Sequence, residues 1–222
     1  MDGGTSRMLA RAQSAGAGSD DLSGALLARR RRTFDAAASS FFALETPDTR
    51  PEAEALIRTA FMRAYGARIE RFLPLLMGLR DGEGSLLAAC GLRYAALSPL
   101  FLEAYLDRPV EAALSATAGE TLRRGDVIEA GNLAVARGGH APLLIAALTR
   151  HLHESGQRWV VFTAVPALAN AFKRLGIALT VLAPALLSAL PAADQIGWGT
   201  YYDRSPRVMA CRVAEAYRAL AA

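Results

Sequence analysis

Apolar residues recur at helical spacing in several segments of the chain. Ile57, Phe61 and Tyr65 fall on one face of a helix that begins near Pro51 and ends near Gly66, a residue typical of a helix C-terminus. On the same grounds, helices are predicted over about residues 51–66, 109–122, 142–156 and 166–175.

Other apolar runs have the composition of strands. Two of them flank Asp81-Gly82-Glu83-Gly84, which predicts a hairpin. The run WVVFTA is apolar almost throughout, as in a strand that is buried on both faces. Strands are predicted at residues 75–80, 85–93, 127–135, 159–164, 177–183 and 208–213. The order of helices and strands indicates a mixed α/β sheet with a central βαβ unit.

The central feature is the stretch DVIEAGNLAVARGGHA, residues 126–141. Its strand carries Glu129 and Asn132, and a glycine-containing loop leads to a helix that opens at Pro142. Free N–H groups in such a loop and the helix dipole both favour an anion such as a pyrophosphate. A glycine that serves turn geometry alone is the alternative. The candidate anion-binding residues are Arg137, Gly138, Gly139, His140 and Ala141.

Composition predicts one globular domain with a tail. The chain has 222 residues, of which 52% are hydrophobic and 21% charged. Residues 1–40 are small and polar and contain the run Arg29-Arg30-Arg31-Arg32, so we expect a flexible tail before a domain at 41–222. A solvated charge run is favoured over contact with nucleic acid or anionic lipid, and the absence of interleaved aromatic residues weakens a nucleic-acid interpretation further. Nucleic acid is therefore not an expected partner.

Several classes of protein are disfavoured. Cys90 and Cys211 stand alone in apolar runs and are expected to be reduced core residues. The histidines have no metal-ligand spacing, so no metal site is predicted. The apolar run 177–193 is interrupted by two prolines and is shorter than the roughly 20 residues of a spanning helix. With no secretory signal at residues 1–23, we expect a cytoplasmic protein without an integral membrane segment.

The chain resembles the bacterial thermostable hemolysin family over roughly residues 61–213. The resemblance rests on YGARI (65–69) with Phe72 and Pro74, LFLE (100–103) with YLD (105–107), EAGNLA (129–134), WVVFTA (159–164), RLG (174–176) and WGTYY (198–202). This family is similar to a branch of the GNAT acyltransferases related to the acyl-homoserine-lactone synthases. The resemblance implies a GNAT-like α/β fold, with a mixed, mostly antiparallel central sheet flanked by helices.

The same resemblance implies an N-acyltransferase that moves an acyl group, expected to be a fatty acyl group, from a thioester to a small-molecule amine. Acyl-CoA or an acyl carrier protein would be the cosubstrate, and no permanently bound cofactor is expected. In the synthases a comparable strand carries Glu followed three residues later by Arg. Here Glu129 matches the Glu and Asn132 replaces the Arg, so S-adenosylmethionine is not implied as the acceptor.

The loop after this strand departs from the GNAT pattern Gln/Arg-x-x-Gly-x-Gly/Ala. Gly139 and Ala141 match its glycine and small positions, but Ala136 stands at the first position. The backbone part of the anion cradle is retained, and an acyl carrier protein becomes an alternative to free acyl-CoA as donor. The predicted donor-binding residues are Leu133, Val135, Arg137, Gly138, Gly139, His140, Ala141 and Asn170.

Acyl transfer requires a base for the amine and a group that stabilises the oxyanion. Glu129 is the candidate base or ammonium-binding group; a structural carboxylate paired with an arginine is the alternative. Asn132 is expected either to orient the acceptor or to satisfy backbone groups at a bulge. Glu103 lies in an apolar run and is a candidate for binding the acceptor amine. Phe172 stands where GNAT enzymes offer a tyrosine acid, so Tyr202 or its neighbour Tyr201 is the candidate acid.

Some interpretations remain open from sequence alone. The apolar runs 97–106 and 179–190 either line an acyl tunnel or form ordinary core. Asp107 is a candidate cap for the helix that follows it. Two further functions are a membrane-active lytic protein, as the family's name suggests, and a catalytically inactive GNAT-like binding module.

Overall fold

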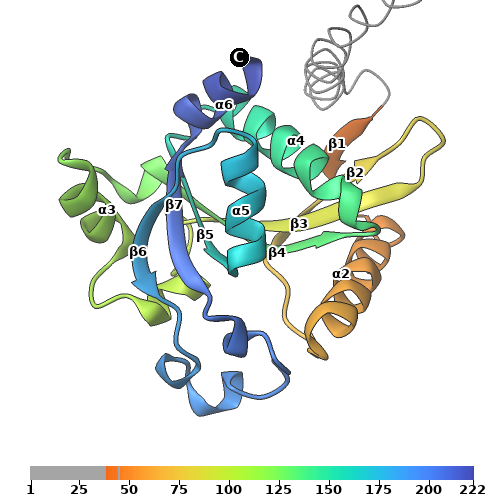
Figure 1. The fold of residues 1–222 in the computed structure, drawn as a ribbon, viewed down its shortest axis with the longest axis horizontal. Coiled ribbons are helices and arrows are strands. Elements are labelled where there is room, and N and C mark those ends of the chain that lie inside the picture. Colours follow the sequence, from red (N-terminus) through yellow and green to blue (C-terminus); the bar gives the residue numbers. More distant parts are fainter. Residues whose placement is uncertain (1–38, 45) are drawn as a thin grey trace, which may run out of the picture.

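The computed structural model describes residues 39–44 and 46–222. They form a seven-stranded sheet in the order β1-β2-β3-β4-β5-β7-β6 (Figure 1). Neighbouring strands are antiparallel except β4 and β5, which are parallel. The strands are β1 Ser40–Ala43, β2 Leu75–Arg80, β3 Leu86–Tyr94, β4 Val127–Val135, β5 Trp159–Ala164, β6 Thr180–Pro184 and β7 Arg207–Arg212. The mixed, mostly antiparallel sheet expected from the sequence is confirmed.

Helices cover both faces of this sheet. The α-helices are α2 Thr49–Tyr65, α3 Val110–Ala118, α4 Ala141–Glu154, α5 Pro166–Arg174 and α6 Val213–Ala221. Short 3₁₀ helices are η1 Phe101–Tyr105, η2 Arg124–Asp126, η3 Gly138–His140, η4 Leu187–Ala189, η5 Ala192–Asp194 and η6 Tyr202–Arg204. Side chains of α4, α5 and α6 pack into one core cluster with the strands. On the opposite face, one cluster joins α2 to β2–β4 and another joins η1 and α3 to β5 and β7.

The predicted elements agree closely with the observed ones around the central unit. β4 spans the predicted residues 127–135, and the following helix and strand complete a parallel βαβ unit. The helix predicted at 109–122 ends earlier, because Gly119 adopts the left-handed conformation with φ +67°. The strand predicted at 177–183 begins at Thr180 instead. β1 and α6 were not predicted, because β1 is short and α6 follows β7 directly.

The predicted boundary between tail and domain remains a prediction. Residues 1–38, which include the arginine run, lie outside the described residues, and β1 already begins at Ser40. Among the described residues, no helix combines the length and apolar character needed to cross a membrane.

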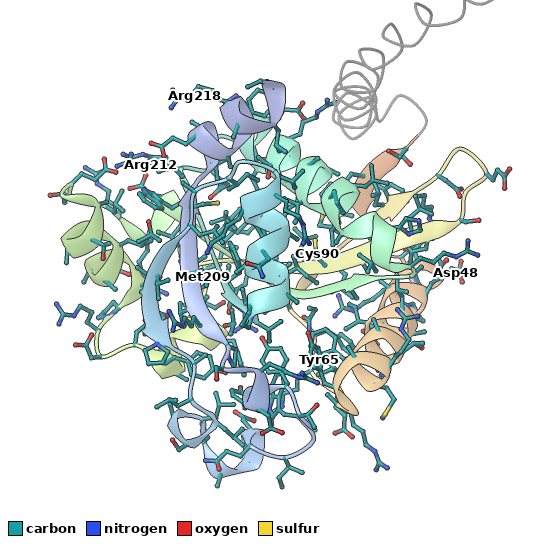
Figure 2. All side chains as sticks on the ribbon, in the orientation of Figure 1. Asp48, Tyr65, Cys90, Met209, Arg212 and Arg218 are labelled. Carbon is teal, nitrogen blue, oxygen red and sulfur yellow. The ribbon has the colours of Figure 1, made fainter. Side chains whose placement is uncertain are left out.

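Both cysteines are free and buried, as the sequence indicated. Cys90 lies on β3 inside the sheet (Figure 2) and Cys211 on β7. Burial raises the pKa of each thiol to about 12, so both thiols are protonated near neutral pH. They are core residues of the α4–α6 face.

Candidate active site

The central strands β4 and β5 separate part of the way along the sheet. They are paired from Val127–Trp159 to Glu129–Val161, after which β4 runs on to Val135 and β5 to Ala164 without pairing to each other. Backbone groups that face this opening are not used in a ladder between the two strands. An extended ligand can therefore bind to strand backbone at this point.

A β-bulge lies on β4 just beyond the separation. Gly91 pairs with Gly131 and Ala89 pairs with Ala134, so the single residue between them on β3 faces both Asn132 and Leu133. Asn132 has φ +50°, in the left-handed region that asparagine tolerates better than most residues. Its Oδ1 accepts a hydrogen bond from the N–H of Leu73 at 2.9 Å. The amide thus satisfies a backbone group at a bulge, one of the two roles expected of it.

Two glycines allow the segment that contains Leu73 to approach the sheet. A Cβ atom at Gly91 would lie 2.6 Å from the Leu73 Cβ, and one at Gly131 would lie 2.9 Å from Leu73 Cδ1. Real Cβ atoms do not approach this closely. The glycine of the EAGNLA motif therefore serves close packing over the bulge.

Glu129 lies on the face of the sheet opposite the α4–α6 core, and its side chain is only 4% exposed. Its Oε2 accepts the N–H of Phe101 at 2.9 Å and its Oε1 accepts the N–H of Leu102 at 3.0 Å. Burial raises the pKa of this carboxyl, and these two hydrogen bonds and nearby Arg93 oppose the rise. Its hydrogen-bond partners are therefore backbone groups at the start of η1. They take the place of the arginine that the sequence suggested as a partner.

Glu103 has a different environment, although it lies on η1 close to Glu129. Its oxygens accept the N–H groups of Leu100 and Val110 and two N–H groups of the Arg124 guanidinium, at 2.7–3.1 Å. Burial opposes ionisation, but these hydrogen bonds and the Arg124 charge hold the pKa of Glu103 at about 2. The carboxylate is thus ionised and fully engaged by this chain.

This arrangement corrects the role considered for Asp107. Asp107 is exposed and pairs with the adjacent Arg108 at 2.9 Å, and no side chain at the α3 N-cap position caps that helix. The N–H of Val110, the first residue of α3, is instead bound by Glu103. Residues distant from a helix in sequence can cap it when tertiary packing brings their oxygens to its free N–H groups.

Tyr202 is hydrogen-bonded to Tyr105 through their hydroxyl oxygens, 2.5 Å apart. Tyr105 is buried, and burial is the main reason that its pKa lies far above the usual range; the nearby Glu129 charge adds to the rise. The Tyr105 hydroxyl therefore stays protonated. Sequence reasoning missed Tyr105, although it lies within the YLD motif that carried the family resemblance.

The two tyrosines belong to an aromatic cluster that packs on the face of the sheet that carries Glu129. Its rings, joined by centroid distances of 5.1–6.2 Å, are Phe61, Tyr65, Phe101, Tyr105, Trp198, Tyr201 and Tyr202. Gly199 explains part of the WGTYY motif, because a Cβ atom there would lie 2.0 Å from the carbonyl oxygen of Tyr65. The neighbouring Thr200 N–H donates to that same oxygen at 2.8 Å. The motif thus fixes the tyrosines against the C-terminus of α2.

The glycine loop lies at the far end of β4. Gly138 and Gly139 are exposed, and a Cβ atom at either would meet no atom within 4 Å. His140 is half-buried with its Nδ1 3.2 Å from the carbonyl oxygen of Leu87, and α4 begins at Ala141 with no capping side chain among the described residues. Arg137 is exposed. The His140 N–H donates to the carbonyl oxygen of Arg137 at 3.1 Å, whereas the two glycines lie exposed at the surface just before the start of α4, where an anion is favoured.

Arg63 is a second arginine at this loop, and no pattern in the sequence pointed to it. Its guanidinium donates to the carbonyl oxygens of Ala136 at 3.3 Å and Val135 at 3.2 Å, at the point where β4 ends. It reaches the loop from α2, more than 70 residues away in the chain. Its charge adds to the attraction of this region for an anion.

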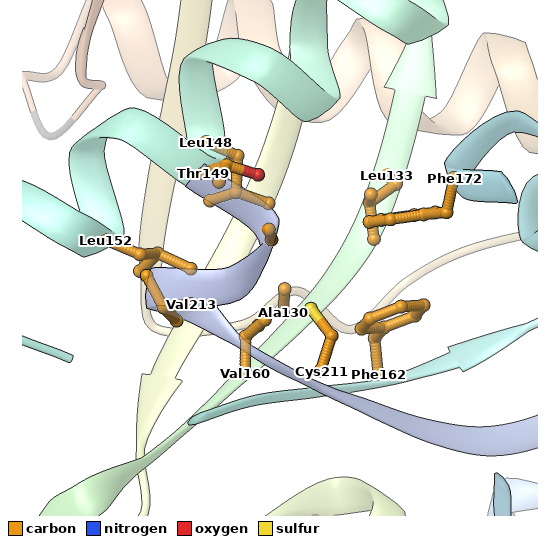
Figure 3. A pocket seen from close by; sticks show the side chains of 11 residues that line it. Ala130, Leu133, Leu148, Thr149, Leu152, Val160, Phe162, Phe172, Cys211 and Val213 are labelled. Atoms are coloured by element: carbon orange, nitrogen blue, oxygen red, sulfur yellow. The ribbon is translucent and has the colours of Figure 1, made fainter. Parts of the chain in front are cut away.

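The remaining predicted donor-binding residues lie around α5 and the opposite face of β4. Asn170 is exposed on α5, and Phe172 is buried with its ring stacked on Phe162 at 4.8 Å. Leu133 lines a small apolar cavity of about 10 Å³, and Val135 packs against the same core cluster. Figure 3 shows that the cavity lies between the strands and the helices, with the two phenylalanine rings at one end.

The structure thus brings the predicted residues together in three places along β4. Glu129, Asn132, Glu103 and Tyr202 lie on or beside one face, the glycine loop lies at the end of the strand, and Leu133 points to the other face. The apolar runs considered as an acyl tunnel contribute instead to the core cluster around η1 and α3, and neither run lines the cavity. The described residues contain no cluster of potential metal ligands.

Comparison with known proteins gives a family and a fold. The model of the family called thermostable hemolysin matches residues 43–217. No curated protein is significantly similar in sequence. Among solved structures, FeeM, an N-acyl amino acid synthase from uncultured soil microbes, superimposes with a TM-score of 0.55 and 19% identity over 80% of this chain and 92% of that chain.

Two acyl-homoserine-lactone synthases have the same fold. For LasI the TM-score is 0.54 at 14% identity, over 82% of this chain and 93% of that chain. For BjaI, described as CoA-dependent and solved with SAM and isopentyl-CoA, it is 0.51 at 13% identity, over 82% and 87%. The GNAT-like fold expected from the sequence is confirmed by these likenesses.

Proposed function

Because this chain belongs to the thermostable hemolysin family and has the fold of these synthases, we propose that it is an acyltransferase. It moves an acyl group from the thioester of CoA or of an acyl carrier protein to the amine of a small molecule. One observation carries the proposal: β4 leaves β5 directly after the Glu129–Val161 pair. The opening offers strand backbone to a bound thioester beside a buried carboxylate.

Glu129 suits the role of the base in this reaction. An amine attacks a thioester only as the neutral species, so an ammonium group must lose a proton first. The pKa of Glu129 is raised, which makes its carboxylate a stronger base than an ordinary glutamate. It accepts the proton directly or through a water molecule.

Tyr202 is the proposed acid for the leaving thiolate. Its hydroxyl is half-buried in the aromatic cluster and is held by Tyr105, whose own hydroxyl stays protonated. If Tyr105 donates the hydrogen bond, the Tyr202 proton is free to be donated to another group. Glu103 was the other candidate for the acceptor site, and its full set of hydrogen bonds supports a role in holding η1, α3 and Arg124 together.

The glycine loop would hold the phosphate groups of the donor. The exposed residues Gly138 and Gly139 and the uncapped start of α4 fit a pyrophosphate, because backbone N–H groups at the start of a helix attract an anion. Arg137 and Arg63 supply positive charge at the same place. Free acyl-CoA and a carrier-protein phosphopantetheine both present phosphate here, and the assay below separates them.

The apolar cavity between β4, β5 and the helices is the proposed site for the end of the acyl group. About 10 Å³ holds roughly one water-sized group. A fatty acyl chain would therefore need the stacked rings of Phe162 and Phe172 to move apart. Short acyl groups need little rearrangement, so acyl-CoAs of graded length measure how far the cavity opens.

The decisive experiment incubates the purified protein with these acyl-CoAs and a pool of amino acids and polyamines. Free-thiol release and product mass are followed, and release is expected to depend on the amine and to be lost in Glu129→Ala. If no CoA thioester reacts, the assay is repeated with acyl-carrier-protein thioesters. Failure of both donors would overturn the proposal.

The family's name suggests a lytic protein instead. None of the described helices is long and apolar enough to span a membrane. Leakage of a dye from liposomes by the protein alone, without any thioester, would support that alternative. The cytoplasmic location expected from the sequence stays a prediction.

A further inference from the structure

The side-chain amide of Asn132 lies on the face of β4 that carries Glu129. A Cβ atom at Gly91 would approach the Asn132 Oδ1 to 3.1 Å, which places the amide over β3 at the bulge. The residue follows Glu129 just beyond the last β4–β5 pair. Asn132 therefore stands where the two strands have separated, on the side of the proposed base.

The orientation of this amide is fixed by its neighbour. The N–H of Leu73 can bond only to an acceptor, so the Asn132 oxygen must face Leu73. The NH₂ group then points away from Leu73, and no described residue accepts a hydrogen bond from it. Asn132 thus has a pair of N–H donors on the face of β4 that carries Glu129, and the acceptor of the same amide is turned toward Leu73.

A free donor selects its partner by chemistry. An ammonium group has only donors and gains nothing from a second donor, so the Asn132 NH₂ does not bind the protonated acceptor amine. The thioester carbonyl oxygen is an acceptor, and it becomes a far stronger one when it carries negative charge. A carboxylate on the acceptor molecule is the competing possibility, and it predicts a different kinetic result.

We infer that the Asn132 NH₂ group donates a hydrogen bond to the thioester oxygen and stabilises the oxyanion of the proposed acyl transfer. This inference rests on the proposed function. The amine nitrogen bonds to the carbonyl carbon, whose π electrons move to oxygen. The intermediate then re-forms the carbonyl, breaks the carbon–sulfur bond and releases a thiolate. The nitrogen of the intermediate loses its extra proton to Glu129, which has by then passed the earlier ammonium proton to solvent. Tyr202 protonates the thiolate and regains a proton from solvent.

The backbone conformation supports this role. Asn132 and Ser205 are the described non-glycine residues with positive φ, and such residues gather at functional sites. Glycine would relieve the strain at this position, yet the chain has an asparagine there. The hydrogen bond from Leu73 holds the amide in place before substrate binds, which is what an efficient oxyanion donor requires.

Two substitutions test the inference in the thiol-release assay. Asn132→Asp keeps an oxygen for the Leu73 N–H and tolerates the positive φ, but loses the NH₂ donor. Asn132→Gly keeps the backbone conformation and adds no charge. Both are expected to lower kcat by roughly 10²–10³-fold, with the KM of both substrates changed only a few-fold. Thermal unfolding of both variants is measured alongside, to show that they fold.

The outcomes separate the possible explanations. If both variants fold and keep kcat within about threefold of the wild type, the inference is wrong while the proposed function stands. An increase confined to the KM for the acceptor would show that Asn132 binds a carboxylate, which also overturns the inference. Loss in Asn132→Asp alone would indicate an effect of charge and not of the donor. A wild-type protein that releases no thiol from any donor would overturn the proposed function and this inference together.

Discussion

A buried carboxylate, Glu129, and a partly buried one, Glu103, lie near each other on the same side of the sheet, and their surroundings shift their pKa values in opposite directions. Glu103 is bound by Arg124 and two backbone N–H groups, and its pKa is held at about 2. Glu129 accepts two backbone N–H groups and forms no ion pair among the described residues; burial raises its pKa, and the charge of nearby Arg93 opposes only part of that rise. An ionised, saturated carboxylate holds segments together, whereas a buried one with a raised pKa can exchange a proton.

The comparison also shows how the two groups depend on each other. Glu129 binds the N–H groups at the start of η1, and Glu103 lies within η1 and binds the start of α3. The segment fixed by Glu103 is thus the one that positions the donors around Glu129. We therefore expect substitutions at Glu129 to change chemistry first and substitutions at Glu103 to change stability first.

The largest expected effect is that of Glu129→Gln on turnover. Loss of a general base lowers kcat by roughly 10²–10⁴-fold. The free energy of unfolding should change by no more than about 1–3 kcal/mol, because the glutamine NH₂ group faces one backbone N–H while a buried charge is removed. Thiol release and urea unfolding measure the two quantities.

A matched control is Glu83→Gln, an exposed glutamate in the turn between β2 and β3. It should leave both quantities unchanged. If Glu129→Gln keeps wild-type kcat, Glu129 is a structural carboxylate and the contrast with Glu103 disappears.

Glu103→Gln should have the next largest effect, and on stability. It removes the ion pair with Arg124 while Arg124 keeps Glu111 at 3.0 Å. Because the pair is partly buried, we expect a loss of about 2–3 kcal/mol in the free energy of unfolding, between the values for surface and buried pairs. Urea unfolding measures it. A fall in kcat by more than about a hundredfold in the folded variant would instead support the acceptor-binding role predicted for Glu103.

The pH dependence of stability should differ in sign between the two carboxylates. The folded-state pKa of Glu103 is depressed, so its contribution is present above its unfolded pKa and is lost as the pH falls toward about 2. The pKa of Glu129 is raised, so its contribution is present below its unfolded pKa and is lost as the pH rises through the folded pKa.

Unfolding curves from about pH 7 to 2 would show both effects. The stability difference between the wild type and Glu103→Gln should narrow below about pH 4.5, the usual value for a glutamate. The difference between the wild type and Glu129→Gln should shift in favour of the wild type as the pH falls. Parallel curves for all three proteins would contradict the assigned environments.

The smallest expected effect is that of Tyr105→Phe. It removes the hydroxyl that holds Tyr202, and a single hydrogen bond is worth about 0.5–1.5 kcal/mol. We expect kcat to fall several-fold with KM unchanged, and the alkaline limb of the pH–rate profile to move. Tyr94→Phe, a half-buried tyrosine on β3, is the matched control. An unchanged pH–rate profile in Tyr105→Phe would show that Tyr105 does not influence proton donation by Tyr202.

The central βαβ unit could be predicted because its signals are local. The apolar run of β4, the glycines of the following loop and the proline at the start of α4 are all read from adjacent residues. The same applies to Phe172, whose apolar ring excluded an acid at that position before its stacking on Phe162 was known. β1 was missed because four residues carry too few periodic positions, and α6 was missed because it follows β7 directly, with no turn residue to mark its start.

The partners of the candidate residues could not be predicted in the same way. Glu129 was expected to pair with an arginine if it were structural, but it binds the N–H groups of Phe101 and Leu102, which lie 28 and 27 residues away in sequence. The Tyr105–Tyr202 hydrogen bond joins residues separated by 97 positions. Neither contact leaves a periodic signal, because each depends on where a loop comes to lie over the sheet.

The sequence by itself determined the family, the order of the elements and the presence of Glu129 and Asn132 on the central strand, because residue type and local spacing contain that information. The tertiary structure alone decided what those side chains face. Among the described residues Glu129 is buried without an ion pair, whereas Glu103 pairs with Arg124, and the N–H of Leu73 turns the Asn132 amide so that its NH₂ group faces away from Leu73. Dielectric environment and hydrogen-bond direction arise only when distant segments pack together.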